Sequence, residues 1–191
     1  MMRNSEDRMM NQRDRIWTVP NAMSAARLFF VVPMLYCLAH EARGWFVFWV
    51  ILGIASDFLD GYIARRFDQQ SNLGRMIDPL SDKLNVVLVS GFLVHSRLYA
   101  FPLWFFVFLL VRELLVLTAG LWFRWKHGMV PESSGPGKYS AFFTGICVLM
   151  YALKLQPWAS VLMWMALLLT VYSTIVYYRI FRKQITLDRK V

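Results

Sequence analysis

The sequence predicts an all-α integral membrane protein with six transmembrane helices. Of its 191 residues, 58% are apolar and only 17% are charged, whereas soluble domains average about 45–50% apolar and about 25% charged residues. The apolar residues gather in six segments, and none shows the strict alternation of a membrane β-strand. Lys and Arg gather in alternate loops, which is typical of a multi-pass helical protein. The composition excludes an ordinary soluble domain and a disordered chain.

The first three predicted helices are delimited by polar residues. The first starts after Pro20-Asn21 and contains Pro33, which neighbouring membrane helices can accommodate. The second ends at a pair of arginines, and the third follows the polar stretch after that pair. Each is close to the roughly 20 residues that a membrane crossing needs. We expect these helices at residues 22–39, 44–66 and 73–94.

The last three predicted helices follow the same logic. The polar stretch 128–138, GMVPESSGPGK, separates the fourth from the fifth and is either a connector or a cover over the functional site. Cys37 and Cys147 both lie inside apolar segments, so we expect small buried hydrophobic residues rather than a disulfide or a zinc site. We expect these helices at residues 98–124, 138–153 and 155–178.

The six segments form one predicted domain, residues 20–183. Residues 1–19 are expected to be a cytoplasmic juxtamembrane amphipathic segment, with a floppy tail as the alternative for residues 1–10, and residues 184–191 a cytoplasmic tail. No secretory signal pattern is found in the first residues, which favours a prokaryotic cytoplasmic membrane over a targeted organelle.

The cations explain the net charge of +9. With six spans both termini lie on one side, and that side collects 16 of the 21 Lys and Arg residues, against 3 on the other side (Arg43, Arg97 and Lys154) and 2 inside spans (Lys83 and Arg112). An excess of this kind marks the cytoplasmic side, so both termini are predicted to be cytoplasmic and nucleic-acid binding is not expected. The 16 cations are Arg3, Arg8, Arg13, Arg15, Arg27, Arg65, Arg66, Arg75, Arg124, Lys126, Lys138, Arg179, Arg182, Lys183, Arg189 and Lys190.

Carboxylates inside the spans carry the functional information. An intramembrane charge costs about 2.5–3.5 kcal/mol even on the most lenient scale, so such residues mark sites. Asp57 and Asp60 are three residues apart in the second segment, and Asp78 and Asp82 are four apart in the third, so each pair shares a helix face. All four lie in the cytoplasmic half, which predicts a water-accessible cavity open to the cytoplasm.

Four carboxylates in one cavity repel one another unless a cation holds them. Oxygen ligands suit Mg²⁺, Mn²⁺ or Ca²⁺, and two ions would match the number of charges and would clamp a phosphoryl group during transfer. Gly61 follows Asp60 directly and Gly74 lies one turn before Asp78. Each glycine alone is typical of helix packing, whereas two beside two acid pairs indicate the close approach of a ligand.

Residues 57–82 read DFLDGYIARRFDQQSNLGRMIDPLSD. The pattern D-x-x-D-G-x-x-A-R, eight further residues, and G-x-x-x-D-x-x-x-D resembles the signature of the CDP-alcohol phosphatidyltransferases at every fixed position. The resemblance continues outward through W-T-V-P-N at 17–21 and the polar positions Arg112-Glu113 and Gly137-Lys138, over about residues 17–183. These outer positions resemble the phosphatidylglycerophosphate and cardiolipin synthase branches of the family.

The resemblance implies transfer of a phosphatidyl group from CDP-diacylglycerol to an alcohol, with release of CMP. It implies that Asp57, Asp60 and Asp78 bind Mg²⁺ or Mn²⁺, with Asp82 close to the metals and acting as the general base. It also implies a homodimer. The residues implied to contact the nucleotide or the donor phosphates are Asn21, Gly61, Ala64, Arg65 and Gly74.

The acceptor is expected to be glycerol 3-phosphate, an anion that needs cations near the site. Candidates are Arg112, Lys138 and Arg124. A structural ion pair is the alternative for Arg112; Glu113 points about 100° away on a helix and is therefore not the expected partner. Lys83 is either a counter-charge for a carboxylate or a substrate contact.

Two departures keep other acceptors open. Glycerophosphate-using relatives often carry a second arginine eight residues after the first, and this chain has Gly120 there. The segment LWFRW at 121–125 resembles cardiolipin synthases, whose acceptor is phosphatidylglycerol. Cardiolipin synthase is thus the second hypothesis and a phosphatidylinositol-phosphate synthase the third. Outside this class stand a divalent-cation transporter, disfavoured because the acids cluster on one side without an inverted repeat, and a catalytically inactive scaffold.

Overall fold

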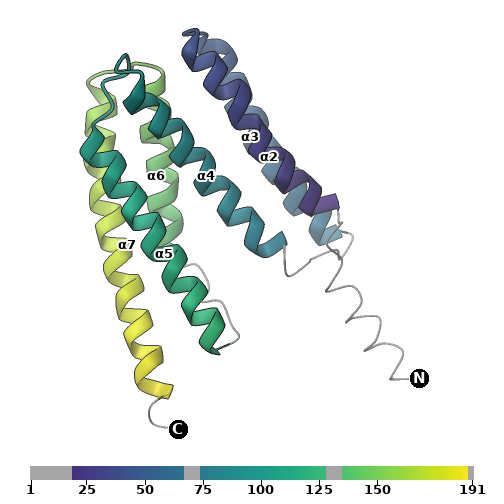
Figure 1. Ribbon diagram of the computed structural model, residues 1–191, viewed down its shortest axis with the longest axis vertical. Helices are drawn as coiled ribbons and strands as arrows, with labels where there is room; N and C mark the ends of the chain where they lie inside the picture. Colours follow the sequence, from purple (N-terminus) through teal and green to yellow (C-terminus); the bar gives the residue numbers. More distant parts are fainter. Residues whose placement is uncertain (1–18, 67–73, 128–134, 189–191) are drawn as a thin grey trace. The chain divides into compact units, whose positions relative to one another are not determined.

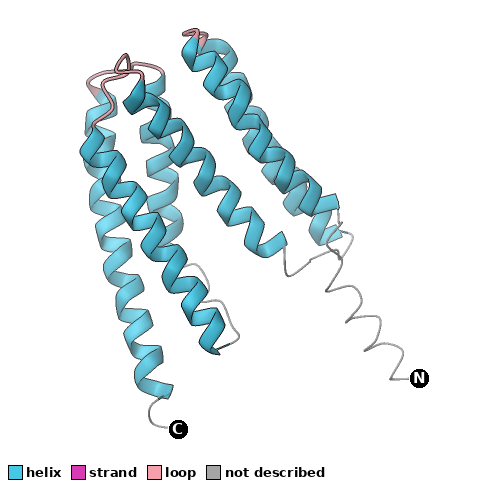
Figure 2. Ribbon diagram, viewed as in Figure 1, coloured by secondary structure: helices cyan, strands magenta, loops and turns pink. Residues whose placement is uncertain are grey.

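The computed structural model describes residues 19–66, 74–127 and 135–188, and these ranges are helical apart from short turns. Over these ranges no strand is present, which confirms the all-helical class (Figure 2). The six helices coincide with the six apolar segments of the sequence (Figure 1). They are α2 (Val19–Ala39), α3 (Arg43–Arg66), α4 (Gly74–His95), α5 (Leu103–His127), α6 (Gly135–Ala152) and α7 (Trp158–Asp188).

Two boundaries differ by more than three residues from the sequence prediction. Helix α5 starts at Leu103 rather than at residue 98, because Arg97 and Ala100 adopt positive φ angles of 51° and 50°, and the Pro102 carbonyl just before the helix accepts its first hydrogen bonds. Helix α7 runs to Asp188 instead of ending near 178. The apolar pattern marks where a membrane span ends, whereas the helix continues through the basic residues beyond it. Part of the predicted tail 184–191 is therefore helical.

The chain divides into two compact units, residues 1–92 and 93–191. In the first unit α2 and α3 pack against each other as a hairpin. The turn is closed by the Ala42 amide, which donates to the Cys37 carbonyl at 2.8 Å, and by Glu41, whose φ is 54°. Aromatic rings line the seam: the Phe30 and Trp49 centroids are 5.9 Å apart.

In the second unit α6 and α7 form another packed hairpin. The Leu155 amide donates to the Met150 carbonyl at 3.0 Å across its turn. Small residues face one another along the seam, and the Cys147 thiol contacts the Ala159 carbonyl at 3.9 Å. Cys37 and Cys147 are both free and buried, as the sequence predicts. Small residues allow the two backbones to approach closely, which is how membrane helices associate without a hydrophobic drive.

Helix α5 belongs to the same unit as this hairpin. Trp104 of α5 lies 5.8 Å from Trp164 of α7, measured between ring centroids. Phe101, just before α5, meets the ring of Tyr151 of α6 edge-on at 4.9 Å. Phe105 is completely buried. These contacts fix the depth of α5 against α6 and α7, and so the level at which its polar residues lie.

Two helices of the described ranges are long and apolar enough to cross a membrane, at Leu103–Gly120 and Trp158–Arg179. Shorter apolar helical stretches cover Phe29–Ala39, Arg43–Ser56 and Lys83–His95. Large apolar side chains such as Leu168 and Trp158 lie exposed on α7, where lipid rather than water is the compatible solvent. The chain is thus indicated to be a membrane protein, while the six-span topology and the cytoplasmic placement of the termini stay predictions.

Candidate functional site

The four aspartates of the motif lie on two helices. Asp57 and Asp60 fall in the second half of α3, and Asp78 and Asp82 in the first half of α4. Both segments are helical, so the three- and four-residue spacings do place each pair on one face of its helix. The four side chains lie outside the described part of the structure, so their convergence on one site stays a prediction.

The residues expected to contact the donor also lie on helices. Gly61, Ala64 and Arg65 occupy the last two turns of α3, Gly74 is the first residue of α4, and Asn21 lies in the first turn of α2. All five belong to the first unit, together with the aspartates. Their side-chain contacts fall outside the described residues, and their roles therefore stay predictions.

The donor chemistry of the motif fits a hard divalent cation. Its potential ligands are four carboxylates without a thiol or an imidazole among them, and oxygen-only sets suit Mg²⁺ or Mn²⁺. Where side chains are described, no group of three His, Cys, Asp or Glu residues is placed to hold a metal ion. The aspartates of α3 and α4 lie beyond that part, so they are still the candidate ligands.

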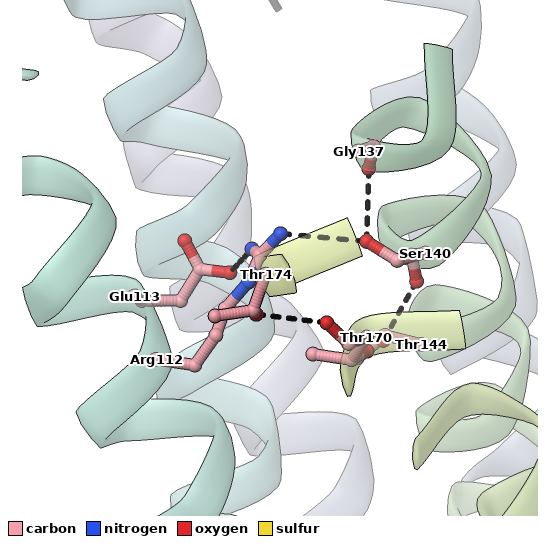
Figure 3. Close-up of polar contacts among 7 residues, drawn as sticks. All are labelled: Arg112, Glu113, Gly137, Ser140, Thr144, Thr170 and Thr174. Atoms are coloured by element: carbon pink, nitrogen blue, oxygen red, sulfur yellow. Dashed lines mark hydrogen bonds and ion pairs between the residues drawn. The ribbon is translucent and has the colours of Figure 1, made fainter. Parts of the chain in front are cut away.

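Arg112 is the best-defined polar residue of the second unit. It lies midway along α5 with only 8% of its surface exposed. One terminal nitrogen, Nη1, forms an ion pair with Oε1 of Glu113. The other, Nη2, donates to the Ser140 hydroxyl of α6 at 3.4 Å, and that hydroxyl donates to the Gly137 carbonyl at 3.0 Å (Figure 3). A buried guanidinium is thus held between α5 and α6.

The ion pair with Glu113 corrects the sequence interpretation. Consecutive helical residues point about 100° apart, and Glu113 was on that ground not the expected partner. The long, flexible side chains of Arg and Glu bring their charged ends together despite this angle. A buried charge without a partner costs far more free energy than the side-chain conformations that this pairing needs. The structural ion pair that the sequence left open for Arg112 is therefore present, and Glu113 is its acid.

The ion pair does not use every donor of Arg112. The guanidinium carries five N–H groups, and the buried Nε has no hydrogen-bond partner in the described surroundings. A buried polar group without a partner costs about 1–3 kcal/mol, more when it is charged. Arg112 is therefore both a structural residue and one with hydrogen-bonding capacity left for a ligand.

The structure places the other predicted cations differently. Lys138 lies exposed near the start of α6, two residues before Ser140. Lys83 lies half-buried in α4 and belongs to the first unit. Arg124 lies near the end of α5, and its side chain is outside the described residues. From another helix the structure therefore brings Ser140 to Arg112, and the contribution of the other cations stays a prediction.

Sequence reasoning missed a set of buried hydroxyls on α6 and α7, one of which, that of Ser140, contacts Arg112. Ser140 and Thr144 of α6 and Thr170 and Ser173 of α7 are all buried. Their three- and four-residue spacing on otherwise apolar helices was the available signal, since such spacing places hydroxyls on one face. The signal is weak, because Ser and Thr are also ordinary packing residues between membrane helices.

Comparison with known proteins identifies a family. The family model described as CDP-alcohol phosphatidyltransferase matches residues 17–172. A cardiolipin synthase (CMP-forming) of Streptomyces coelicolor is 34% identical over 169 residues, covering 85% of this chain and 75% of the relative. A putative cardiolipin synthase of Mycobacterium tuberculosis H37Rv is 30% identical over 183 residues, covering 92% and 86%. A CDP-diacylglycerol–glycerol-3-phosphate 3-phosphatidyltransferase of Aquifex aeolicus is 34% identical over 134 residues, covering 69% and 73%.

Proposed function

The chain belongs to the CDP-alcohol phosphatidyltransferase family, and from this premise we propose that it transfers a phosphatidyl group from CDP-diacylglycerol to glycerol 3-phosphate, releasing CMP. The main support is that all eight fixed positions of the motif, from Asp57 to Asp82, fall inside the matched region and on helices α3 and α4. The enzyme is thereby a membrane transferase of phospholipid biosynthesis. We place its domain at residues 20–183 and its site at the cytoplasmic half of the spans.

The carboxylates divide into two roles in this proposal. Asp57, Asp60 and Asp78 would hold two Mg²⁺ or Mn²⁺ ions, with Asp82 adjacent, and the ions supply neutralisation of the charge on the pyrophosphate. Asp82 accepts the proton of the acceptor hydroxyl. The acceptor oxygen then bonds to the β-phosphorus, which carries the diacylglycerol. The bond from this phosphorus to the oxygen that bridges to the α-phosphorus breaks, and CMP leaves with that oxygen.

Small residues and an arginine position the donor, CDP-diacylglycerol, in this proposal. Gly61, Ala64 and Gly74 leave room for the nucleotide against α3 and α4. Arg65 contacts a phosphate or the nucleotide, and Asn21 contributes from the start of α2. A site at the membrane interface serves a donor that has two fatty chains and an anionic head, because both halves then stay in a compatible solvent.

The acceptor phosphate is assigned to the cations of the second unit. Arg112 is buried, and its Nε has no hydrogen-bond partner within the described part of the chain, which supports a role in binding an anion. Lys138 is exposed and lies two residues before Ser140, the residue that contacts Arg112. Arg124 is the third proposed contact. Positively charged donors with fixed geometry bind phosphate oxygens strongly because both partners are charged.

Phosphatidylglycerol is a second candidate acceptor, favoured by specific observations. Gly120 stands where a second arginine is expected for glycerol 3-phosphate. Glu113 also offsets the charge of Arg112. A phosphodiester monoanion needs less positive charge than a phosphomonoester, which carries up to two negative charges.

CMP release by the purified protein tests the proposal. CDP-diacylglycerol and Mg²⁺ or Mn²⁺ are supplied with one acceptor at a time: glycerol 3-phosphate, phosphatidylglycerol, inositol phosphate or serine. Release with glycerol 3-phosphate alone is the expected result. Release with phosphatidylglycerol alone makes the protein a cardiolipin synthase. Absence of release and of donor binding would overturn the enzyme assignment in favour of a cation transporter or a scaffold.

Replacement of the proposed base sharpens this test. We expect Asp82→Asn to lower the rate of CMP release by about 10² to 10⁴, the usual contribution of general base catalysis, while donor binding persists. Asp68→Asn is the matched control, because it removes the same charge from the segment between α3 and α4 at a position outside the motif. Full activity of Asp82→Asn would remove Asp82 as the base.

A homodimer is our proposal for the assembly. It is tested separately by the mass of the protein in detergent, measured by light scattering. A monomer that releases CMP at the full rate would contradict it without affecting the reaction.

A further inference from the structure

The buried face of α7 changes character along its length. Its buried residues recur every three or four positions, so they form one stripe along the helix. The stripe begins at the α6–α7 turn with apolar residues and ends with two hydroxyls. In order, its members are Ala159, Met163, Ala166, Thr170 and Ser173.

The two hydroxyls of this stripe differ from others on these helices. Ser and Thr in a membrane helix commonly donate to the carbonyl three or four residues earlier. Thr174 does so, with its hydroxyl 2.8 Å from the Thr170 carbonyl, and so does Thr144, 2.8 Å from the Ser140 carbonyl. In contrast, Thr170 Oγ1 and Ser173 Oγ have no hydrogen-bond partner among the described residues, although the two residues are only 2% and 0% exposed.

The register of the hairpin places Thr170 within about one turn of the level at which α6 contacts Arg112. Cys147 pairs with Ala159, and the Tyr151 hydroxyl lies 3.5 Å from the sulfur of Met163, which fixes how α6 and α7 run past each other. Two turns beyond the Tyr151–Met163 contact, this antiparallel register brings Thr170 level with Thr144, which lies one turn from Ser140. Ser140 is the residue that accepts from Arg112, and the close-up shows the three helices meeting there (Figure 3).

Within the described residues, three buried hydrogen-bond donors of α5 and α7 therefore lack partners: Arg112 Nε, Thr170 Oγ1 and Ser173 Oγ. An apolar packing role explains the burial of Thr and Ser but not the lost hydrogen bonds, which each cost about 1–3 kcal/mol. A cationic donor together with two groups that both donate and accept is complementary to a phosphate oxygen beside a free hydroxyl. That combination is the glycerol phosphate unit.

We propose that Thr170 and Ser173 form, with Arg112, a subsite for the glycerol phosphate unit of the acceptor, and that their hydroxyls determine acceptor specificity. This inference rests on the proposed function and deepens it, because both candidate acceptors contain that unit. A site built to hydrogen-bond a substrate hydroxyl discriminates strongly against alcohols that leave its own polar groups unpaired. Acceptors without a hydroxyl next to the phosphate-bearing glycerol carbon are accordingly disfavoured.

The test uses the full-length enzyme in detergent micelles with Thr170→Val and Ser173→Ala, which remove one hydroxyl each with little change in size. We expect each to raise the KM for the acceptor by about threefold to tenfold, the value of one hydrogen bond, and to leave the KM for CDP-diacylglycerol unchanged. Thr170→Ser, which keeps the hydroxyl, restores the acceptor KM. Glycerol 3-phosphate and phosphatidylglycerol are titrated separately, which identifies the source of the glycerol phosphate unit.

Thr174→Val is the matched control, because its hydroxyl lies on the same helix turn and is already bonded to the Thr170 carbonyl. We expect it to leave both KM values unchanged. The inference is overturned when folded Thr170→Val and Ser173→Ala keep the wild-type acceptor KM, or when they change the KM values of donor and acceptor equally. Wild-type protein that releases CMP with neither acceptor overturns the proposed function instead, and these outcomes are distinguishable.

Discussion

The two helical hairpins of this protein are held together by different side chains. Between α2 and α3, rings such as Phe30 and Trp49 fill the seam, and Gly53 of α3 faces Phe30 of α2. Between α6 and α7 the seam consists largely of small residues, among them Cys147 and Ala159, and it turns polar toward Ser140. The difference teaches that a seam of small residues can accommodate buried hydroxyls, whereas a seam filled by aromatic rings leaves them no space.

The largest predicted effect on stability concerns the Arg112–Glu113 ion pair, which lies where α5 meets the polar end of the α6 seam. We expect Glu113→Gln to lower the free energy of unfolding by about 3 kcal/mol, because it leaves the buried Arg112 charge without its acid. Chemical unfolding in detergent measures the change. The double variant Arg112→Met with Glu113→Gln is the control, and it should regain most of the loss. Equal stability of Glu113→Gln and wild type would show that the pair is not buried as described.

Enlarging a residue in the small-residue seam is the next largest effect. Ala166 is completely buried on α7. We expect Ala166→Leu to destabilise the protein by about 1–3 kcal/mol, because the helices must separate to admit the added atoms. Leu168→Ala, on the exposed side of the same helix, serves as the reference and should change stability little. A neutral Ala166→Leu would mean that the seam is loosely packed.

Adding a methyl group to the aromatic seam between α2 and α3 should raise stability rather than lower it. A Cβ at Gly53 would lie 3.7 Å from Met34 Cε and 3.9 Å from Phe30 Cδ2, which is ordinary van der Waals contact. We expect Gly53→Ala to stabilise the protein by about 0.5–1 kcal/mol, since alanine favours the helix over the unfolded chain. Thermal unfolding followed by circular dichroism checks this. A decrease in the midpoint temperature would show that the seam is tighter than these distances.

The helices were predictable because the features that determine them lie close together along the chain. Each of the six apolar segments became a helix, since length and hydropathy are read directly along the chain. Their ends were less predictable where membrane and helix boundaries differ, as at Asp188, or where a turn depends on residues such as Ala100 with positive φ. The aspartate motif was equally local, and the family match over residues 17–172 confirmed the class of enzyme that it predicted.

The environment of Arg112 was not predictable in the same way. Spacing on a single helix argued against Glu113, and nothing local pointed to Ser140, which lies 28 residues away. The burial of the Thr170 and Ser173 hydroxyls could likewise not be predicted, because a buried and an exposed serine look the same in a sequence.

The sequence by itself determined the positions of the helices, the spacing of the four aspartates and the enzyme family, because these depend on residues close together along the chain. The tertiary structure alone decided which helix faces meet. It placed Ser140 against Arg112, closed the small-residue seam, and buried two hydroxyls of α7 that have no partner in the described ranges. The physical reason is that burial and pairing depend on neighbours from other helices, and the choice of those neighbours is a property of the packed bundle.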